Sequence, residues 1–304
     1  MERKTIIVHS GGFHADDLFA TDVTLTYLEK KGYQKEQINI VRTRDPELIE
    51  KGDIVLDVGG ILNPEKFRFD HHQEGGAGTR ENGIPYAAFG LAWKFFAPQM
   101  ELSDYVIRHV DEKLVQTIDA LDNGIDVFGV PEVEIPYRYT IQGAIYSLHP
   151  TWNEIGYSVD DAFFRALPIV HTFLEREIAQ AFGEESGQLI AREQYELTKH
   201  EKPELLILDG HYPYSRVVES MPDVQFVVKP SEDGENWKAR TIRKNRSGFN
   251  ARKLFPEEWA GKSNEELADI TGVPDAKFVH NKRFIAVAGS KEGALALAEK
   301  SLKH

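Results

Sequence analysis

Two neighbouring histidines follow an aspartate at Asp70-His71-His72-Gln73, in a chain that has only 11 His in 304 residues. Imidazoles and carboxylates act as general acids and bases and as ligands of divalent metals. Residues 66–70 alternate polar and apolar side chains, as a half-buried strand does, and the glycine-rich residues 74–78 cannot continue regular structure. The cluster is therefore predicted where a strand ends and a loop begins, a place from which ligands on a rigid scaffold reach a cleft.

His71 and His72 are adjacent in the sequence, which limits how both imidazoles can reach one site. Neighbouring side chains on a strand point to opposite faces, so both imidazoles can serve one site only if the backbone turns there. The alternative is that one histidine is a hydrogen-bonded surface residue and the other packs under the loop. The other ligand-type residues of the N-terminal half favour a shared site.

A second set of such side chains follows the first apolar run of the chain. Residues 5–8 read as a buried strand, and residues 17–30 have helical spacing. His9 therefore lies at the carboxyl end of a strand, and His14 and Asp16 lie in the turn and at the start of the helix. Open α/β sheets place their sites at such junctions. Ordinary hydrogen bonding in a glycine loop is the alternative, and the closeness of Asp16 to His14 favours ligand function.

Two further aspartates stand at expected ends of regular structure. Asp57 lies within an apolar strand and directly before Gly59-Gly60, where an ionised carboxylate is costly unless it is paired or bound to metal. The alternative for Asp57 is a capped loop residue. Asp122 precedes an Asn-Gly pair that suits a helix end, and taken alone it reads as a capping or turn residue. Asp119 competes with Asp122 for any catalytic role.

The ligand-type residues mostly fall at strand ends: His9, His14, Asp16, Asp57, Asp70, His71, His72 and Asp122. The chain has no cysteine, and a thiolate-free set of imidazoles and carboxylates suits Mn²⁺, Zn²⁺, Co²⁺ or Fe²⁺ better than Ca²⁺. The groups suffice for two metals about 3.5–4 Å apart that share a bridging carboxylate. Such a pair lowers the pKa of a bridging water and stabilises charge on a phosphoryl group, so no serine or cysteine nucleophile is required.

A basic stretch lies in the C-terminal half, between residues 238 and 253. It contains no acidic residue and seven cations: Lys238, Arg240, Arg243, Lys244, Arg246, Arg252 and Lys253. Guanidinium groups match phosphate oxygens in pairs, and His280 and Arg283 could extend the patch. The alternative is a solvated edge strand guarded by charge. The net charge of −13 argues against nonspecific nucleic-acid binding over the whole surface.

The chain is long enough for two domains, and its alternating strands and helices predict the α/β class. We expect an N-terminal domain over residues 1–193, with a parallel sheet and flanking helices. A smaller mixed α+β domain is expected over residues 194–304. Residues 160–199 are expected to be helical and to link the two, with Pro168 kinking or restarting the helix.

A cytoplasmic location is expected. The absence of cysteine fits a reducing compartment, and residues 1–12 offer only a short apolar run, too little for a signal peptide. No segment approaches the length of a membrane span. Metal identity, RNA against DNA preference and oligomeric state stay open, with a homodimer among the options.

Four motifs resemble those of the DHH phosphoesterase superfamily, and in particular its Myg branch: residues 9–16, 57–60, 70–73 and 121–124. The C-terminal stretches at residues 255–261, 272–274, 278–280 and 292–295 look like the Myg signature. The resemblance spans most of the chain. The combination of the His9–Asp16 motif with Asp70–Gln73 is specific, whereas each motif alone is weak.

The resemblance implies a DHH-type N-terminal domain and a metal-dependent hydrolase that holds two Mn²⁺, with Mg²⁺, Co²⁺ or Zn²⁺ as alternatives. It implies one ion on His9, His14 and Asp57, and a second on Asp16, Asp57, His71 and Asp122. His72 would act at the scissile phosphate and Asp70 would orient an imidazole. The implied activity is a 3′→5′ exonuclease on RNA or short single-stranded oligonucleotides, whose phosphates would be bound between the domains by Arg240, Arg243, Lys244, Arg246 and His280.

Two departures from the family pattern bear on this expectation. His14 stands where the superfamily usually has aspartate, which is a trait of the Myg branch. Ala286-Val287 stand where the family usually has Gly-Gly, and they would obstruct a backbone that must approach a ligand closely. Two other functions are therefore kept as alternatives: a phosphatase or pyrophosphatase on a small nucleotide or phosphoanhydride, and a non-catalytic metal- or nucleotide-binding protein.

Overall fold

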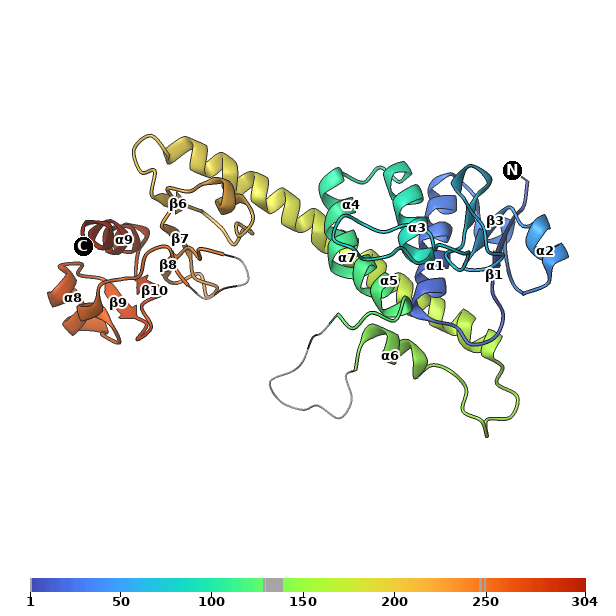
Figure 1. The fold of residues 1–304 in the computed structure, drawn as a ribbon. Helices are drawn as coiled ribbons and strands as arrows, with labels where there is room; N and C mark the ends of the chain where they lie inside the picture. Colours follow the sequence, from blue (N-terminus) through green and yellow to red (C-terminus); the bar gives the residue numbers. More distant parts are fainter. Residues whose placement is uncertain (1, 128, 130–138, 246–247, 249) are drawn as a thin grey trace. The chain divides into compact units, whose positions relative to one another are not determined.

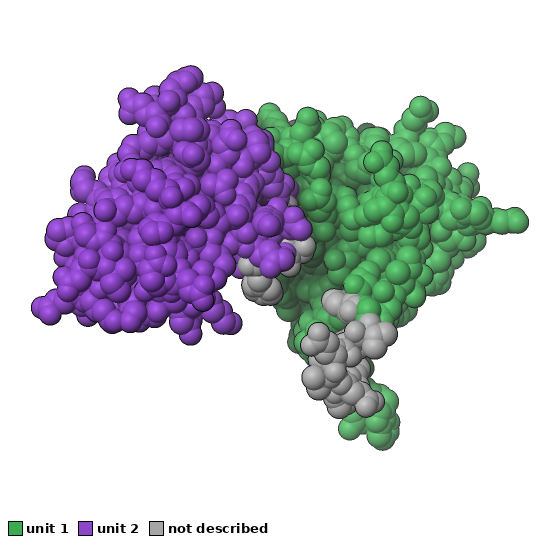
Figure 2. Space-filling model, turned by 60° about the vertical axis from the view of Figure 1, so that its left-hand side comes forward, with its two compact units in different colours: residues 1–182 green, residues 183–304 purple. Residues whose placement is uncertain are grey.

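The structure is a computed structural model that describes residues 2–127, 129, 139–245, 248 and 250–304. The chain divides into two compact units, residues 1–182 and residues 183–304, coloured green and purple in Figure 2. The predicted boundary between residues 193 and 194 and the observed division both fall inside the long helix α7 (Val159–Thr198). In the described part of the chain, no helix combines the length and apolar character that crossing a membrane would require.

The N-terminal unit is built on a five-stranded sheet in the order β2-β1-β3-β5-β4 (Figure 1). Its strands are β1 (Lys4–Val8), β2 (Ile38–Arg42), β3 (Ile54–Leu56), β4 (Leu62–Asn63) and β5 (Arg68–Phe69). The pairs of β1 with β2, of β1 with β3 and of β3 with β5 are parallel, and β4 is antiparallel to β5. The α/β class is confirmed, and the sheet is mixed because β4 and β5 are joined by a short turn.

Helices pack around this sheet. They are α1 (Ala15–Lys30), α2 (Pro46–Lys51), α3 (Ala88–Phe96), α4 (Asp104–Val110), α5 (Gln116–Asp122), α6 (Ile141–Tyr146) and α7, with a π-helical turn η4 (Asp111–Val115) and short 3₁₀ turns η1 (Lys35–Gln37), η2 (Pro64–Lys66) and η3 (Ala97–Gln99). Residues 104–122 form α4, η4 and α5 in succession. The helix α7 continues through Pro168, so of the expected kink or restart at this residue the restart is wrong.

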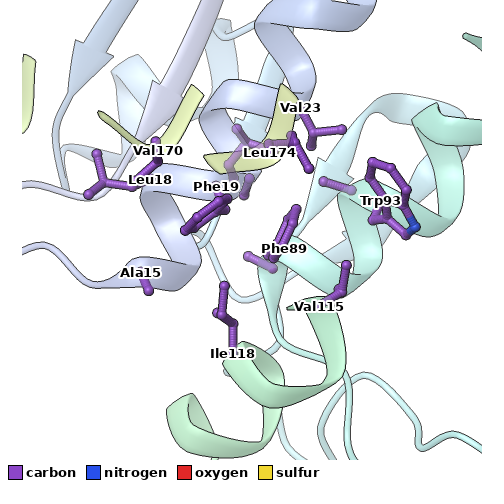
Figure 3. Close-up of a cluster of buried hydrophobic side chains, with 14 of the residues drawn as sticks. Ala15, Leu18, Phe19, Val23, Phe89, Trp93, Val115, Ile118, Val170 and Leu174 are labelled. Carbon is purple, nitrogen blue, oxygen red and sulfur yellow. The ribbon is translucent and has the colours of Figure 1, made fainter. Parts of the chain in front are cut away.

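The core of the N-terminal unit lies where α1, α3, α5 and the first part of α7 meet. Figure 3 shows Phe19 of α1 against Phe89 of α3, with Val170 and Leu174 of α7 beside α1. The rings of Phe19 and Phe89 have their centroids 5.2 Å apart, and these side chains are almost completely buried. This packing fixes α1, α3 and α5 relative to one another, which matters because α1 and α5 carry candidate ligands.

The C-terminal unit has its own five-stranded sheet in the order β6-β7-β8-β10-β9. Its elements are β6 (Leu205–Ile207), β7 (Phe226–Pro230), β8 (Trp237–Thr241), β9 (Ala276–Val279), β10 (Ile285–Ala288), α8 (Asn264–Thr271), α9 (Lys291–Lys303) and the 3₁₀ turns η5 (Val217–Ser220) and η6 (Glu257–Trp259). One face packs under α8 and α9 around Phe226 and Leu297. The other face, near β6 and β7, packs against the end of α7 through Ala191 and Tyr195.

Candidate metal centre

The loop after β1 carries His9, whose ring is almost completely buried. Its Nδ1 lies 3.3 Å from the carbonyl oxygen of Ser10. Its Nε2 lies 3.1 Å from Oδ2 of Asp17 and 3.3 Å from Oδ2 of Asp57. Burial acts to lower the pKa of His9, but the contacts with Asp17 and Asp57 outweigh it and raise that pKa to about 10. Positive charge is therefore strongly favoured at this nitrogen, as proton or as metal ion.

Asp57 follows β3 directly and adopts a left-handed backbone conformation, with φ of 55°. Aspartate tolerates this region better than most residues. The turn directs its carboxylate between two imidazoles: Oδ2 toward His9 and Oδ1 toward Nε2 of His71, each at 3.3 Å. Burial acts to raise the pKa of Asp57, but His71 and His9 together hold it below its ordinary value. Asp57 is thus an ionised carboxylate that joins two halves of the cluster.

Asp70 organises the two neighbouring histidines. Its Oδ1 accepts the backbone N–H groups of His71 and His72 at 2.7 and 3.2 Å, and its Oδ2 accepts the N–H of Gly60. The same Oδ1 lies 2.7 Å from Nδ1 of His72. The backbone turns at this point and brings the two imidazoles together, with ring centroids 4.2 Å apart. With Nδ1 engaged by Asp70, the Nε2 atom of the 61% exposed His72 side chain is left for other partners.

Asp122 at the end of α5 meets the same cluster. Its Oδ2 lies 3.2 Å from Nε2 of His71, and its Oδ1 lies 3.5 Å from Nδ1 of His14. Burial acts to raise the pKa of Asp122, but His14 and His71 lower it far below its ordinary value. The structure therefore places His14 against Asp122, with its ring centroid 5.9 Å from that of His9.

Asp16 is completely buried and does two things at once. Its oxygens accept the backbone N–H groups of Ala88 and Phe89 at 3.0 and 2.7 Å, at the start of α3. A carboxylate atom of Asp16 also lies within 4.8 Å of ligand atoms of His71 and Asp122. Each carboxylate oxygen has two lone pairs, so capping α3 leaves Asp16 able to bind a cation.

Among the described residues, two groups of side chains have ligand atoms within 4.8 Å of one another, close enough to hold a metal ion: Asp57, His71 and His72 in one, and Asp16, His71 and Asp122 in the other. Within this cluster, Oδ1 of Asp57 and Nε2 of His71 are buried and make no hydrogen bond of good geometry, although they lie 3.3 Å apart. Buried polar atoms left in this way are typical of metal ligands. Nitrogen and carboxylate donors fit Mn²⁺ or a similar divalent ion. The residues present therefore fit a metal centre in which the two groups share His71.

Asp119 is the alternative to Asp122 for a catalytic role in the sequence analysis. It lies in neither of the two ligand groups found among the described residues. It is completely buried; its Oδ1 accepts the N–H of Gly90 at 3.0 Å, and its Oδ2 lies 2.7 Å from Nη1 of Arg80. Nη2 of Arg80 in turn lies 2.8 Å from Oδ1 of Asp111. Burial raises the pKa of Asp119 to about 7, although Arg80 acts to lower it. This network ties the loop that follows His72 to α3 and to the helix that carries Asp122.

Sequence reasoning missed Asp17 and the segment around α6. An acidic residue at the third helical position is ordinary capping, and Oδ1 of Asp17 indeed accepts the N–H of His14 at 2.8 Å, so nothing in the sequence pointed to its contact with His9. In the second segment, Oε1 of Gln142 accepts the N–H of Ala15 at 2.9 Å, and Nε2 of His149 accepts that of Phe13 at 3.3 Å. These contacts span more than a hundred residues, and no local motif announces them.

The predicted phosphate-binding residues lie in the C-terminal unit. Arg240 is exposed on β8, and Arg243 and Lys244 are exposed just after it, while Arg246 falls outside the described residues. His280 follows β9, with its ring centroid 4.3 Å from that of Phe284 and with Nδ1 accepting the N–H of Lys282. The strand β8 lies between β7 and β10, so the alternative of a charged edge strand is wrong.

Comparison with known proteins gives consistent results. The family model MYG1_exonuc, described as an uncharacterised protein family (UPF0160), matches residues 5–302. A MYG1 protein of Dictyostelium discoideum is 30% identical over 100% of this chain and 98% of its own length. The MYG1 exonuclease of Rattus norvegicus is 29% identical over 99% of this chain and 85% of its own. An alignment with a solved pGpG-specific phosphodiesterase from Vibrio cholerae covers 100% of both chains at 11% identity, with a TM-score of 0.29.

Proposed function

Because the chain belongs to the MYG1 exonuclease family, we propose that it is a metal-dependent 3′→5′ exonuclease on RNA or short single-stranded oligonucleotides. The chain is an enzyme of the hydrolase class, as relatives named exonucleases indicate. The observation that carries the proposal is the meeting of imidazoles and carboxylates from separate loops in two ligand groups that share His71. Such a centre suits phosphodiester hydrolysis because bound cations offset the charge that builds up on the phosphoryl oxygens.

The family resemblance gives the proposed ligand roles, and it keeps His72 for the substrate although His72 also lies in one ligand group with Asp57 and His71. His9 and Asp57 would hold one ion, with His14 assigned there by the family resemblance although it lies against Asp122. Asp16, Asp57, His71 and Asp122 would hold the second, with Asp57 shared. We propose Mn²⁺, with Mg²⁺, Co²⁺ or Zn²⁺ as alternatives for a thiolate-free set. When bound, such ions supply an activated water and offset charge on the phosphoryl group.

His72 is proposed to act on the substrate. Asp70 holds Nδ1 of His72 at 2.7 Å, which fixes the ring and directs Nε2 away from the buried carboxylates. A ring placed in this way can stabilise charge on the scissile phosphate or donate a proton to the leaving oxygen. Asp70 itself is engaged by three backbone N–H groups, so its role is to orient the imidazole.

The cations of the C-terminal unit are proposed to bind the backbone phosphates of the substrate. Arg240, Arg243 and Lys244 are exposed and belong to a stretch, residues 238–253, whose sequence contains no acidic residue. Lys238 already pairs with Glu232, and Arg252 is engaged by backbone carbonyl groups. The proposed phosphate contacts therefore rest on Arg240, Arg243 and Lys244, with Arg246 and His280 added from the family resemblance.

The test compares two alanine variants by metal content and by activity. We expect His72→Ala to keep near-normal metal content and to lose turnover of a dinucleotide and of 5′-labelled RNA with added Mn²⁺. Asp57→Ala is expected to lose metal as well, because it removes the carboxylate shared by two imidazoles. His200→Ala, an exposed histidine of the C-terminal unit, is the matched control and should change neither quantity.

Three outcomes would contradict these assignments. If His72→Ala stripped the metal and Asp57→Ala did not, the roles would be reversed. Hydrolysis of pyrophosphate alone, with no phosphodiester cleaved, would replace the exonuclease with a phosphatase. Full metal loading without cleavage of any phosphoester would indicate a binding protein.

A further inference from the structure

An exposed aromatic ring lies beside the candidate metal centre. Tyr146, the last residue of α6, is 47% exposed. Its ring lies edge-on to that of His14, with the centroids 5.8 Å apart and an interplanar angle of 80°. His14 is itself 39% exposed and contacts Asp122. Tyr146 is therefore separated from a candidate ligand group by a single imidazole.

The position of Tyr146 is fixed by the surrounding structure. The helix α6 packs against α1 and α5 (Figure 1), and the side chain of Ile145 is buried in the N-terminal core. Gln142 of the same helix accepts the N–H of Ala15 at the start of α1. The ring of His149 packs 5.5 Å from Tyr146 and 4.0 Å from Phe13, measured between centroids. The tyrosine is thus held on the same framework as His9, His14 and Asp16.

A partly exposed aromatic ring held rigidly beside a phosphodiester-cleaving centre has a specific chemical use. The centre itself is lined by carboxylates, which repel a polyanionic strand wherever a bound cation does not offset them. A neutral ring attracts a nucleobase without regard to charge, and stacking tolerates every base because each has a π face. The substrate feature that fits Tyr146 is therefore a nucleobase and not a phosphate.

We propose that Tyr146 is a specificity-determining residue that stacks on the nucleobase next to the scissile phosphate. This inference rests on the proposed function, because it adds the base-recognition element to the same centre. It assigns the preference for nucleotide substrates over base-free phosphodiesters to one side chain of the N-terminal unit. Alanine substitution of rings that stack on bases in single-strand-binding proteins weakens binding by roughly 5- to 150-fold per base.

The test uses substrates that differ only in their bases. These are the dinucleotide ApA and two analogues in which one or the other adenosine is replaced by an abasic tetrahydrofuran residue. The variants are Tyr146→Leu, which removes the ring, and Tyr146→Phe, which keeps it. Trp152→Leu, at a 97% exposed aromatic of the following loop, is the matched control. Metal content is measured for every variant, so that loss of the centre is recognised.

We expect Tyr146→Leu to lower kcat/KM for ApA by roughly 5- to 150-fold, mainly through KM, with metal content unchanged. One of the two abasic analogues should be cleaved equally by the wild type and by this variant, which identifies the base that stacks. Tyr146→Phe and Trp152→Leu should behave like the wild type. An equal loss on all three substrates, or a loss with Trp152→Leu as large as with Tyr146→Leu, would overturn the proposal.

A binding measurement separates this inference from the proposed function. AMP and ribose 5-phosphate differ only by the base, and calorimetric titration of the Mn²⁺-loaded chain should show tighter binding of AMP. That difference should vanish in Tyr146→Leu. If no phosphodiester were cleaved but the difference behaved as expected, the exonuclease assignment would fail and the base contact would stand. If AMP bound no better than ribose 5-phosphate, the base contact would fail whatever the activity.

Discussion

Replacing Gly90 with alanine gives a sharp test of the buried network beside the metal centre. Gly90 lies in the first turn of α3, and its N–H donates to Oδ1 of Asp119. A Cβ atom there would lie 1.9 Å from Oδ2 of Asp119 and 2.9 Å from Nη2 of Arg80. A Cβ atom essentially never lies within 3 Å of a nonbonded heavy atom, and Asp119 is completely buried. The carboxylate must therefore move away from both Gly90 and Arg80.

The expected magnitude is the difference between two opposing terms. Glycine to alanine within a helix normally stabilises the helix by about 1 kcal/mol. Separating Asp119 from Arg80 leaves a buried charge with incomplete compensation, which costs about 3–5 kcal/mol. The clash outweighs the helix propensity, and we expect Gly90→Ala to lower the free energy of unfolding by about 2–4 kcal/mol. Because Asp122 lies one helical turn after Asp119, Mn²⁺ affinity should fall as well.

The assay is urea unfolding of the wild type and the variant, with Mn²⁺ affinity measured by calorimetry. The matched control is Gly183→Ala in α7, where a Cβ atom would meet no atom within 4 Å. That substitution should leave stability unchanged or raise it by up to about 1 kcal/mol. The reasoning is refuted if Gly90→Ala proves as stable as Gly183→Ala, since Asp119 would then be free to move without cost.

Two further predictions concern charged groups outside the metal centre. Burial raises the pKa of Asp22 to about 6, although His171, 3.0 Å away, acts to lower it. Because the folded-state pKa lies above the unfolded value, its stabilising contribution is full below pH about 4 and is lost as pH rises through about 6. The free energy of unfolding of the wild type relative to Asp22→Asn should fall by on the order of 1–3 kcal/mol over that range, and a constant difference in urea unfolding would contradict this. Arg252 donates hydrogen bonds to the carbonyl oxygens of Val218, Met221 and Val224 at 2.6–2.8 Å, so Arg252→Met should lower the free energy of unfolding by about 2–4 kcal/mol. The control Arg240→Met, at an exposed site, should change it by no more than about 0.5 kcal/mol. Equal effects of the two substitutions in urea unfolding would show that Arg252 does not stabilise the fold.

The placement of candidate ligands at strand ends follows from short-range sequence patterns. An apolar run followed by glycine marks the ends of β1 and β3, and the parallel pairing of β1, β3 and β5 brings those ends to one edge of the sheet. His9, Asp57 and His71 meet there because equivalent ends of parallel strands are neighbours. The α/β class and the meeting of these residues thus require only the strand pattern and the rule of parallel pairing.

The partner of each side chain depends on contacts that no local pattern contains. Asp16 illustrates this, because its oxygens cap a helix more than seventy residues away. That helix begins after Ala87, which has no capping side chain, so the cap had to come from a distant part of the chain. Asp119 and Asp122 are one helical turn apart in one helix, and only the packing of α3 and Arg80 against the first decides that the second faces His71.

The replacement of two expected glycines by Ala286 and Val287 has unequal consequences in the sheet of the C-terminal unit. Ala286 is completely buried in the core under α9, where its small side chain meets the helix face. Val287 is partly exposed and points to the opposite face, since neighbouring strand residues alternate. It is paired there with Lys238 of β8 and Phe278 of β9. Of the two positions, only Val287 can obstruct a ligand on the open face, and it does so beside a lysine. The prediction of an obstruction therefore depends on Val287 alone, because the side chain of Ala286 is buried in the core.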